Sequence, residues 1–99
     1  MRLFAMVVHD LDRADFRYDA VLKKVAAMGL SDTLKTSDGR ELSLTGNVFA
    51  GKYDETRWEP LTLRNAIVGA VQQIYRECGV TGRIFVTTGR DCPWYVMTL

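Results

Sequence analysis

The chain has 99 residues, of which 47% are hydrophobic and 25% are charged, and its formal net charge at pH 7 is +1. This length supports one modest hydrophobic core and excludes two independent ones, so we predict a single domain over residues 1–99. The near-neutral charge argues against tight nucleic-acid binding by overall electrostatic attraction, so any such binding requires a local patch.

The hydropathy and cysteine patterns bear on the cellular compartment. No apolar run approaches the roughly 18 residues that a membrane helix needs. Acidic residues also follow the first apolar run too soon for a secretory signal. The two cysteines, Cys78 and Cys92, lack the paired spacing of a zinc site or of a disulfide framework. We therefore expect a cytoplasmic protein without a membrane partner.

The first half of the chain predicts a strand, a helix and a hairpin. Residues 2–8 are rich in Leu, Phe, Met and Val, and the run is too short for a typical helix, which indicates a buried strand. From Tyr18 the apolar residues recur at helical spacing until Gly29 ends the helix. Asp38-Gly39 then lies between two short alternating segments, which is a strong hairpin signal.

The second half predicts a strand, a long helix and two more strands. The segment "NVFAGKY", residues 47–53, is typical of a strand. A long helix is expected from near Pro60 to Gly79, because its apolar residues fall at helical spacing: Leu63, Ile67, Ala70, Val71, Ile74 and Cys78. Residues 83–88 and 94–99 complete the pattern as two strands.

This order of elements predicts the fold class. A strand, a helix, strands, a helix and strands is the order of a ferredoxin-like α+β domain, β-α-β-β-α-β, with an additional C-terminal strand. Such a domain has an antiparallel sheet with both helices on one face. We expect that arrangement here.

The other face of the expected sheet is apolar, which predicts a partner. In the first strand Leu3, Ala5 and Val7 point one way and Phe4, Met6 and Val8 the other, so both faces are apolar. An open apolar face usually marks an interface, and Phe4 and Met6 are its expected residues here. The last strand carries Trp94, Tyr95 and Met97 and also needs a cover. We predict a homodimer built sheet against sheet. The alternative is that a long loop from the middle of the chain folds over this face.

The first strand ends in the stretch "HDLDRAD", which suggests a metal site. Asp10 follows the strand directly, and oxygen ligands of this kind suit Mg²⁺. In a symmetric dimer two copies of Asp10 would hold the metal and help to orient a water for phosphodiester cleavage. Asp12 is either a further ligand or a helix cap, and Asp15 is better explained as a cap. His9 is a candidate general base, although a lone histidine is more often structural.

Four short motifs resemble a known superfamily: "VVHD", "AMGL", "TGNVFAG" and "GRIFVTTG". They are similar to the ferredoxin-like superfamily that contains the small CRISPR adaptation subunit, the VapD toxins and the GhoS endoribonuclease antitoxin, over residues 2 to about 90. Asp10 matches the aspartate whose paired copies are associated with metal at a dimer axis in the CRISPR and VapD branches. Asn47, Val48 and Phe49 match the opening of the third strand, and the preceding hairpin looks most like GhoS.

The first functional hypothesis is therefore a homodimeric endoribonuclease-like protein of toxin-antitoxin type, similar to GhoS, which cleaves or binds RNA. Asp10 and His9 are its expected catalytic residues, and Asp10 and Asp12 its expected metal ligands. Arg13 and Arg17 follow closely in the sequence and are expected to steer phosphates.

A second hypothesis is an RNA-recognition-like binding module. Domains of that kind stack bases on aromatic residues of the central strands. Phe49 and Tyr53 are expected on one face of their strand, with Phe85 and Phe4 as neighbours. The basic-glycine-aromatic signature of such modules is missing, and aromatic residues on a sheet are more often core or interface.

A third hypothesis is a regulator or inhibitor of phage or mobile-element type that binds a protein partner and has no catalytic role. The near-neutral charge and the scarcity of catalytic groups suit it. Trp and Arg dominate interface energetics, so Arg57, Trp58, Arg90 and Trp94 are its expected anchors. Trp58 is at least as well explained as a residue that covers the core.

Overall fold

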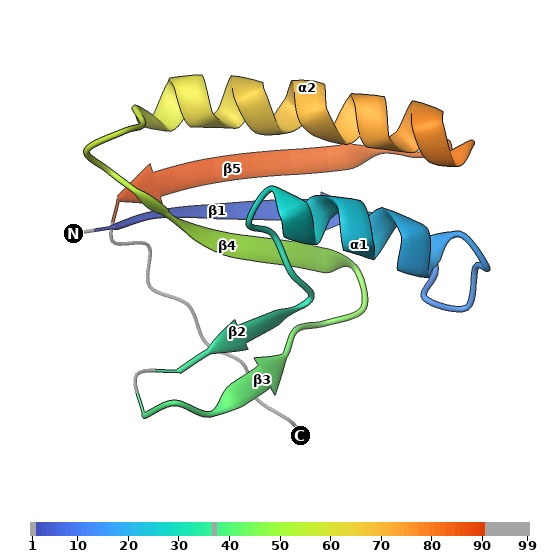
Figure 1. The fold of residues 1–99 in the computed structure, drawn as a ribbon, viewed down its shortest axis with the longest axis horizontal. Coiled ribbons are helices and arrows are strands. Elements are labelled where there is room, and N and C mark those ends of the chain that lie inside the picture. Colours follow the sequence, from blue (N-terminus) through green and yellow to red (C-terminus); the bar gives the residue numbers. More distant parts are fainter. Residues whose placement is uncertain (1, 37, 91–99) are drawn as a thin grey trace.

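The computed structural model describes residues 2–36 and 38–90, which form five strands and two helices (Figure 1). This content confirms the α+β class. The elements in chain order are β1 (Arg2–His9), α1 (Tyr18–Ala27), β2 (Thr33–Lys35), β3 (Glu41–Ser43), β4 (Val48–Asp54), α2 (Pro60–Cys78) and β5 (Ile84–Arg90).

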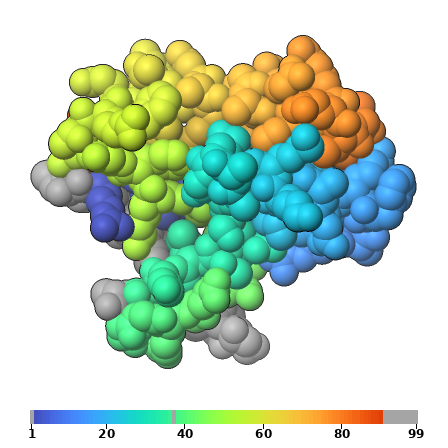
Figure 2. All heavy atoms as spheres, viewed as in Figure 1, coloured from blue at the N-terminus to red at the C-terminus, as the bar shows by residue number. Residues whose placement is uncertain are grey.

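The main sheet has β1 at its centre. Its strand order is β4-β1-β5, and β1 runs antiparallel to both neighbours. Val7 of β1, for example, lies opposite Phe49 of β4 and Val86 of β5. The β2–β3 hairpin forms a separate two-stranded sheet, and an isolated bridge between Ser31 and Ala50 joins the chain just before it to β4. In the space-filling view this hairpin protrudes from the body of the molecule (Figure 2).

The core lies between the helices and one face of β1. Leu3, Ala5 and Val7 are fully buried, whereas Phe4, Met6 and Val8, which point the other way, are half-buried. Both helices contribute to the same cluster of buried residues, because their apolar faces meet these side chains. Its helical members are Tyr18, Val21 and Val25 of α1 and Leu63, Ile67, Val71, Ile74 and Tyr75 of α2.

The structure agrees with the predicted element positions in the described ranges. Both helices end where the sequence indicates, with Gly79 as the C-terminal cap of α2. The turn around Asp38-Gly39 connects β2 and β3. Within these ranges, neither helix combines the length and the apolar character that crossing a bilayer requires.

The predicted last strand, residues 94–99, lies outside the described residues. The same holds for Cys92 and for the expected interface residues Trp94, Tyr95 and Met97. These expectations stay predictions.

Candidate functional site

His9 lies in the core, not in an open site. Its side chain continues the buried alternation of β1, only 3% of it is exposed, and its ring stacks on Phe49 at a centroid distance of 4.2 Å. The backbone N–H of Leu11 donates a hydrogen bond to Nδ1 of His9 over 3.2 Å. Burial lowers the pKa of His9, so the imidazole is neutral at pH 7. A general base must reach its substrate, so this placement contradicts the predicted catalytic role of His9.

Phe49 is also in the core, which corrects its predicted role in RNA binding. Its side chain is fully buried on the helix-facing side of β4, so no base can stack on it. Tyr53 shares that side, whereas Phe4 and Phe85 lie on the opposite face of the sheet. The hydroxyl of Tyr53 donates to the carbonyl oxygen of Met28 over 2.6 Å, and burial raises its pKa to about 12. The four aromatic residues therefore do not form the single stacking surface that we expected.

Asp10 is exposed and is fixed at the end of the central strand. The backbone N–H of Arg83, just before β5, lies 3.3 and 3.2 Å from its two carboxylate oxygens. Gly82 permits this contact, because a Cβ at that position would collide with the carboxylate. Asp10 thus joins the end of β1 to the start of β5, and its carboxylate has a defined direction.

Asp10 lines a surface hollow with several other residues that the sequence singled out. We call it the strand-end hollow; its volume is about 300 Å³, and it is lined by Asp10, Leu11, Asp12, Arg13, Gly46 and Asn47. Asp12 is exposed, and its Oδ1 accepts a hydrogen bond from the backbone N–H of Ala14 over 2.8 Å. Asp12 therefore caps the turn and also faces the hollow.

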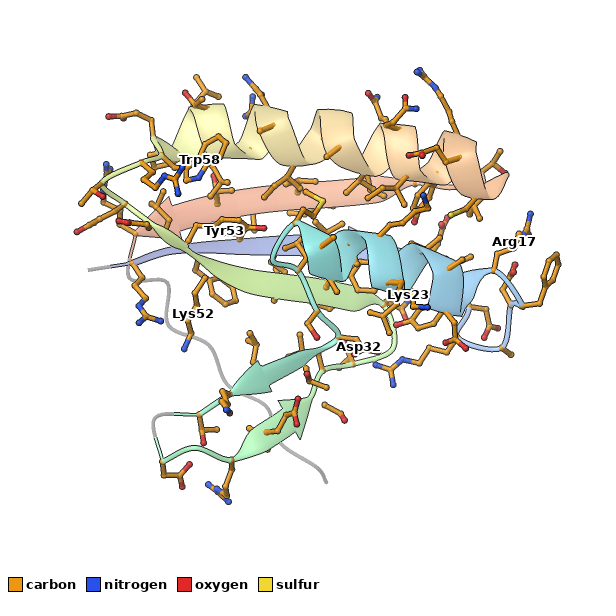
Figure 3. All side chains as sticks on the ribbon, viewed as in Figure 1. Arg17, Lys23, Asp32, Lys52, Tyr53 and Trp58 are labelled. Carbon is orange, nitrogen blue, oxygen red and sulfur yellow. The ribbon has the colours of Figure 1, made fainter. Side chains whose placement is uncertain are left out.

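Arg13 connects the strand-end hollow to the segment around the β2–β3 hairpin. Its Nη2 donates to the carbonyl oxygen of Leu44 over 3.2 Å and lies 3.7 Å from Oδ2 of Asp32. The Tyr18 hydroxyl donates to the same oxygen over 3.2 Å, and Figure 3 shows Asp32 between the helix and the hairpin. With 42% of its side chain exposed, Arg13 still offers positive charge to the hollow.

Arg17 has a structural role and does not line the strand-end hollow. Its Nη2 lies 2.8 Å from Oδ2 of Asp15, and its Nη1 donates to the carbonyl oxygen of Gly79 over 2.7 Å. The Arg17 guanidinium lowers the pKa of Asp15 to about 2. This pair ties the loop after β1 to the end of α2, at the outer end of the molecule (Figure 3). The guanidinium also lies 5.2 Å from the ring of Phe16, which is 90% exposed.

The expected anchors of a protein-binding regulator are only partly available. Trp58 is half-buried and packs against the core cluster. This agrees with the alternative prediction that Trp58 covers the core. Arg57 is exposed, and Nε of Arg90 lies 3.7 Å from Oε2 of Glu55.

The set of side chains that could bind a metal is small in the described part of the chain. The described residues contain no group of three or more His, Cys, Asp or Glu side chains that could hold a metal. Asp10 and Asp12 are the carboxylates of the strand-end hollow, with the amide of Asn47 beside them. These oxygen donors are of the type that Mg²⁺ prefers, and a second copy of the chain would double them.

Sequence reasoning missed several residues that shape the surface. Gly46 lines the strand-end hollow just before β4, and Arg83 reaches Asp10 through its backbone. Lys52 was also missed; it is exposed and lies opposite Phe4, on the face of the sheet that carries the expected aromatic residue Phe85. Figure 3 shows Lys52 and Tyr53 leaving β4 on opposite sides. The alternation of side chains along β4 and β5 shows which residues share a face. It does not show which of the two faces the helices cover.

Comparisons of the chain with protein-family models, with curated proteins and with solved structures found no match. The superfamily resemblance therefore stays a prediction that rests on short motifs.

Proposed function

We propose that this chain is a ferredoxin-like domain that forms a homodimer and acts on RNA as an endoribonuclease of the GhoS-like, toxin-antitoxin kind. The observation that carries the proposal is the placement of Asp10. Its exposed carboxylate is fixed at the end of the central strand, in a hollow that also contains Asp12, Arg13 and Asn47.

The sheet order supports the ferredoxin-like assignment. The order β4-β1-β5, with the chain before β2 bridged to β4, is the arrangement expected of a four-stranded ferredoxin-like sheet. Both helices bury residues in one cluster with the same alternate residues of β1, which agrees with helices on one face. The additional C-terminal strand belongs to the same proposal.

The open face supports the homodimer. Phe4, Met6 and Val8 of β1 are only half-buried, and Phe85 beside them in β5 is 63% exposed. An apolar surface of this kind on a central strand is typical of an interface. Two copies that meet through this face are related by a two-fold axis. We propose that this axis passes close to Asp10 of each copy.

The chemistry of the strand-end hollow fits Mg²⁺ and a phosphodiester. Each carboxylate oxygen has two lone pairs, so the Arg83 N–H leaves acceptor positions on Asp10 for a ligand. Mg²⁺, if bound here, would supply positive charge to a phosphate and would help to activate a water for attack on it. Asp10 and Asp12 would hold the ion, and the exposed part of Arg13 would contact a phosphate oxygen. His9 and Arg17 have structural roles in this proposal.

The experiment combines oligomeric mass with RNA cleavage. Asp10→Asn removes the charge and keeps an oxygen that can accept the Arg83 hydrogen bond, so the fold should persist. We expect a dimer by light scattering and Mg²⁺-dependent RNA cleavage that EDTA abolishes. Cleavage by Asp10→Asn should fall at least about 100-fold, on the order of 3 kcal/mol of lost transition-state stabilisation.

The matched control is Asp19→Asn, because Asp19 is an exposed carboxylate on α1 that does not line the strand-end hollow. It should leave cleavage unchanged. A monomer that degrades no RNA with Mg²⁺, or a rate that Asp10→Asn does not lower, would contradict the proposal.

The open face also favours a second candidate, an RNA-binding module without catalysis. Phe85 and Phe4 offer aromatic surface there, and exposed Lys52 and Arg2 lie on the same face near Phe4. Aromatic surface with nearby cations is what single-stranded RNA binding uses. Because this candidate needs the face that the dimer would bury, salt-sensitive RNA binding by a monomer distinguishes it from the first.

A further inference from the structure

Arg83 lies next to Asp10, just before β5. In the pairing of β1 with β5, His9 lies opposite Ile84, so one further step in the same register brings Asp10 opposite Arg83. The backbone N–H of Arg83 lies 3.2 Å from Oδ2 of Asp10. This contact fixes the Arg83 backbone beside the carboxylate, so its side chain begins at the edge of the proposed site.

The register also gives the side of the sheet to which the Arg83 side chain belongs. Side chains alternate along a strand, and Phe85, two residues further along, is on the open face. Asp10 likewise continues the alternation of Met6 and Val8, which point to that face. Arg83 and Asp10 therefore share the open face, on neighbouring segments of the chain.

The guanidinium of Arg83 is uncommitted in residues 2–36 and 38–90. Arg83 is exposed, and only its backbone N–H contacts Asp10. Within these ranges no ion pair or side-chain hydrogen bond engages the guanidinium. Arg13, in contrast, donates to the carbonyl oxygen of Leu44 and lies 3.7 Å from Oδ2 of Asp32. Arg83 is therefore freer than Arg13 to contact a ligand.

Arg13 and Arg83 lie on different sides of Asp10. Arg13 lines the strand-end hollow with Gly46 and Asn47, which directly precede β4. Arg83 directly precedes β5, the other neighbour of β1. A cation on each side of one carboxylate suits a polymer with regularly spaced phosphates, since guanidinium groups bind phosphate oxygens through charge-assisted hydrogen bonds.

We propose that Arg83 binds a phosphate of the RNA backbone on the β5 side of Asp10, next to the phosphate that is cleaved. This inference rests on the function proposed above and adds a substrate contact to it. The Asp10 carboxylate repels RNA, and Mg²⁺, if bound, would offset that charge. Arg83 itself contributes to holding the RNA and does not take part in the chemical step.

RNA binding in EDTA tests Arg83 without metal and without cleavage. The probe is a short fluorescein-labelled single-stranded RNA of mixed sequence, followed by fluorescence anisotropy. The background is Asp10→Asn, because it removes the repelling charge and keeps an oxygen for the Arg83 N–H. In this background Arg83→Gln should weaken binding about 10-fold, because a charge-assisted contact is lost. The slope of log affinity against log salt should fall by about 0.7, the value for one phosphate of a single strand.

Two further variants separate charge from structure. Arg83→Lys keeps the charge and should bind RNA within about 3-fold of the Asp10→Asn background. Arg64→Gln removes the same charge near the start of α2, whereas Arg83 follows the end of that helix, and it should leave binding unchanged. Every Arg83 variant keeps the backbone N–H that holds Asp10, so the fold should persist, and a thermal melt of each variant checks this.

Cleavage with Mg²⁺ gives a second readout in the chain that retains Asp10. Arg83→Gln should raise KM about 10-fold and change kcat by less than about 3-fold, the pattern of a contact made equally in the ground and transition states. Asp10→Asn should instead lower kcat. An Arg83→Gln variant with an unchanged KM would overturn the proposal.

The binding results also separate this proposal from the one on which it rests. Equal affinities of the Arg83→Gln and Arg64→Gln variants, or an Arg83→Lys variant as weak as Arg83→Gln, would show that Arg83 is not a phosphate contact. If RNA binding depended on Arg83 and no cleavage occurred with Mg²⁺, the contact would stand and the endoribonuclease proposal would fail. Absence of RNA binding by every variant would overturn both.

Discussion

At the residue scale, His9 links the core to the loop that carries Asp10. Its Nδ1 accepts a hydrogen bond from the backbone N–H of Leu11, which requires an unprotonated Nδ1 and therefore places the proton of the neutral ring on Nε2. Nε2 is buried and has no partner among the described residues. A second proton, at Nδ1, would face the Leu11 N–H directly. Protonation of His9 at Nδ1 would therefore break the hydrogen bond that joins it to the loop after β1.

The stability of the fold should depend on pH through His9. Burial lowers the pKa of His9 from the unfolded reference of 6.5, so the unfolded chain binds more protons than the folded chain just below that pH. The free energy of unfolding should be highest above pH 6.5 and fall as the pH drops toward the lowered pKa of the folded state. The slope should not exceed about 1.4 kcal/mol per pH unit, the value for one proton.

Urea denaturation at several pH values between 7.5 and 5 measures this slope. His9→Asn is the control, because its Oδ1 can accept the Leu11 hydrogen bond and its amide does not titrate. The variant loses the stacking on Phe49 and should be less stable overall, but its stability should vary little over this range. An equal slope in both proteins would show that other groups cause the pH dependence.

At the element scale, the contact between the end of α1 and β4 depends on a glycine. Gly51 of β4 is buried, and a Cβ there would collide with the carbonyl oxygen of Gly29, just after α1. Two residues further along β4, the Tyr53 hydroxyl donates to the carbonyl oxygen of Met28. Helix and strand therefore approach each other through backbone, and the missing side chain of Gly51 sets their separation.

Gly51→Ala should therefore be destabilising, by about 1–3 kcal/mol, as is typical of overpacking in a core. The midpoint of urea denaturation measures the change. Gly69→Ala is a matched control, because Gly69 is exposed on α2 and a Cβ there meets nothing within 4 Å. That variant should gain up to about 1 kcal/mol from helix propensity. If Gly51→Ala were as stable as Gly69→Ala, the close approach would not be a constraint.

The sequence predicts elements better than it predicts the sides on which side chains lie. The positions of β1, α1 and α2 follow from local periodicity, which needs no tertiary information. The alternation of β4 does not show whether Phe49 lies on the face that the helices cover or on the open face, because "NVFAGKY" has apolar residues on both. The predicted role of Phe49 in RNA binding required the open face, and Phe49 lies on the other one. His9 shows a missed signal, since it shares the parity of Leu3, Ala5 and Val7. The contact between Asp10 and Arg83 joins residues 73 positions apart, so no local pattern contains it.

At the scale of the whole molecule, the shape is consistent with a two-layer arrangement. The chain measures 36 × 35 × 19 Å along its principal axes. The short dimension corresponds to one sheet layer and one helix layer, each about 10 Å thick. One face of the main sheet packs against the helices in the core cluster, and the other carries Phe85, Lys52 and the half-buried side of β1. Partner binding must therefore be tested on that face.

Phe85→Ser tests whether this face forms the dimer. Phe85 is 63% exposed, so the substitution should leave the fold intact, and serine does not change the charge that RNA would meet. Central aromatic residues of an interface typically contribute about 2 kcal/mol or more. We therefore expect the dimer dissociation constant, measured by light scattering or sedimentation over a concentration series, to rise at least about 30-fold.

Leu61→Ser is the control for this substitution, because Leu61 is 59% exposed but lies on α2. It removes a similar apolar side chain without touching the sheet and should leave the dimer unchanged. Equal weakening by both variants would indicate nonspecific apolar association. If the unmodified chain were monomeric and Phe85→Ser lowered its affinity for RNA, the dimer would be contradicted. That result would favour the RNA-binding module, because the Phe85 ring would then stack on a base. The paired Asp10 site requires a dimer that Phe85→Ser weakens and Leu61→Ser does not, because only a dimer through this face would bring two copies of Asp10 together.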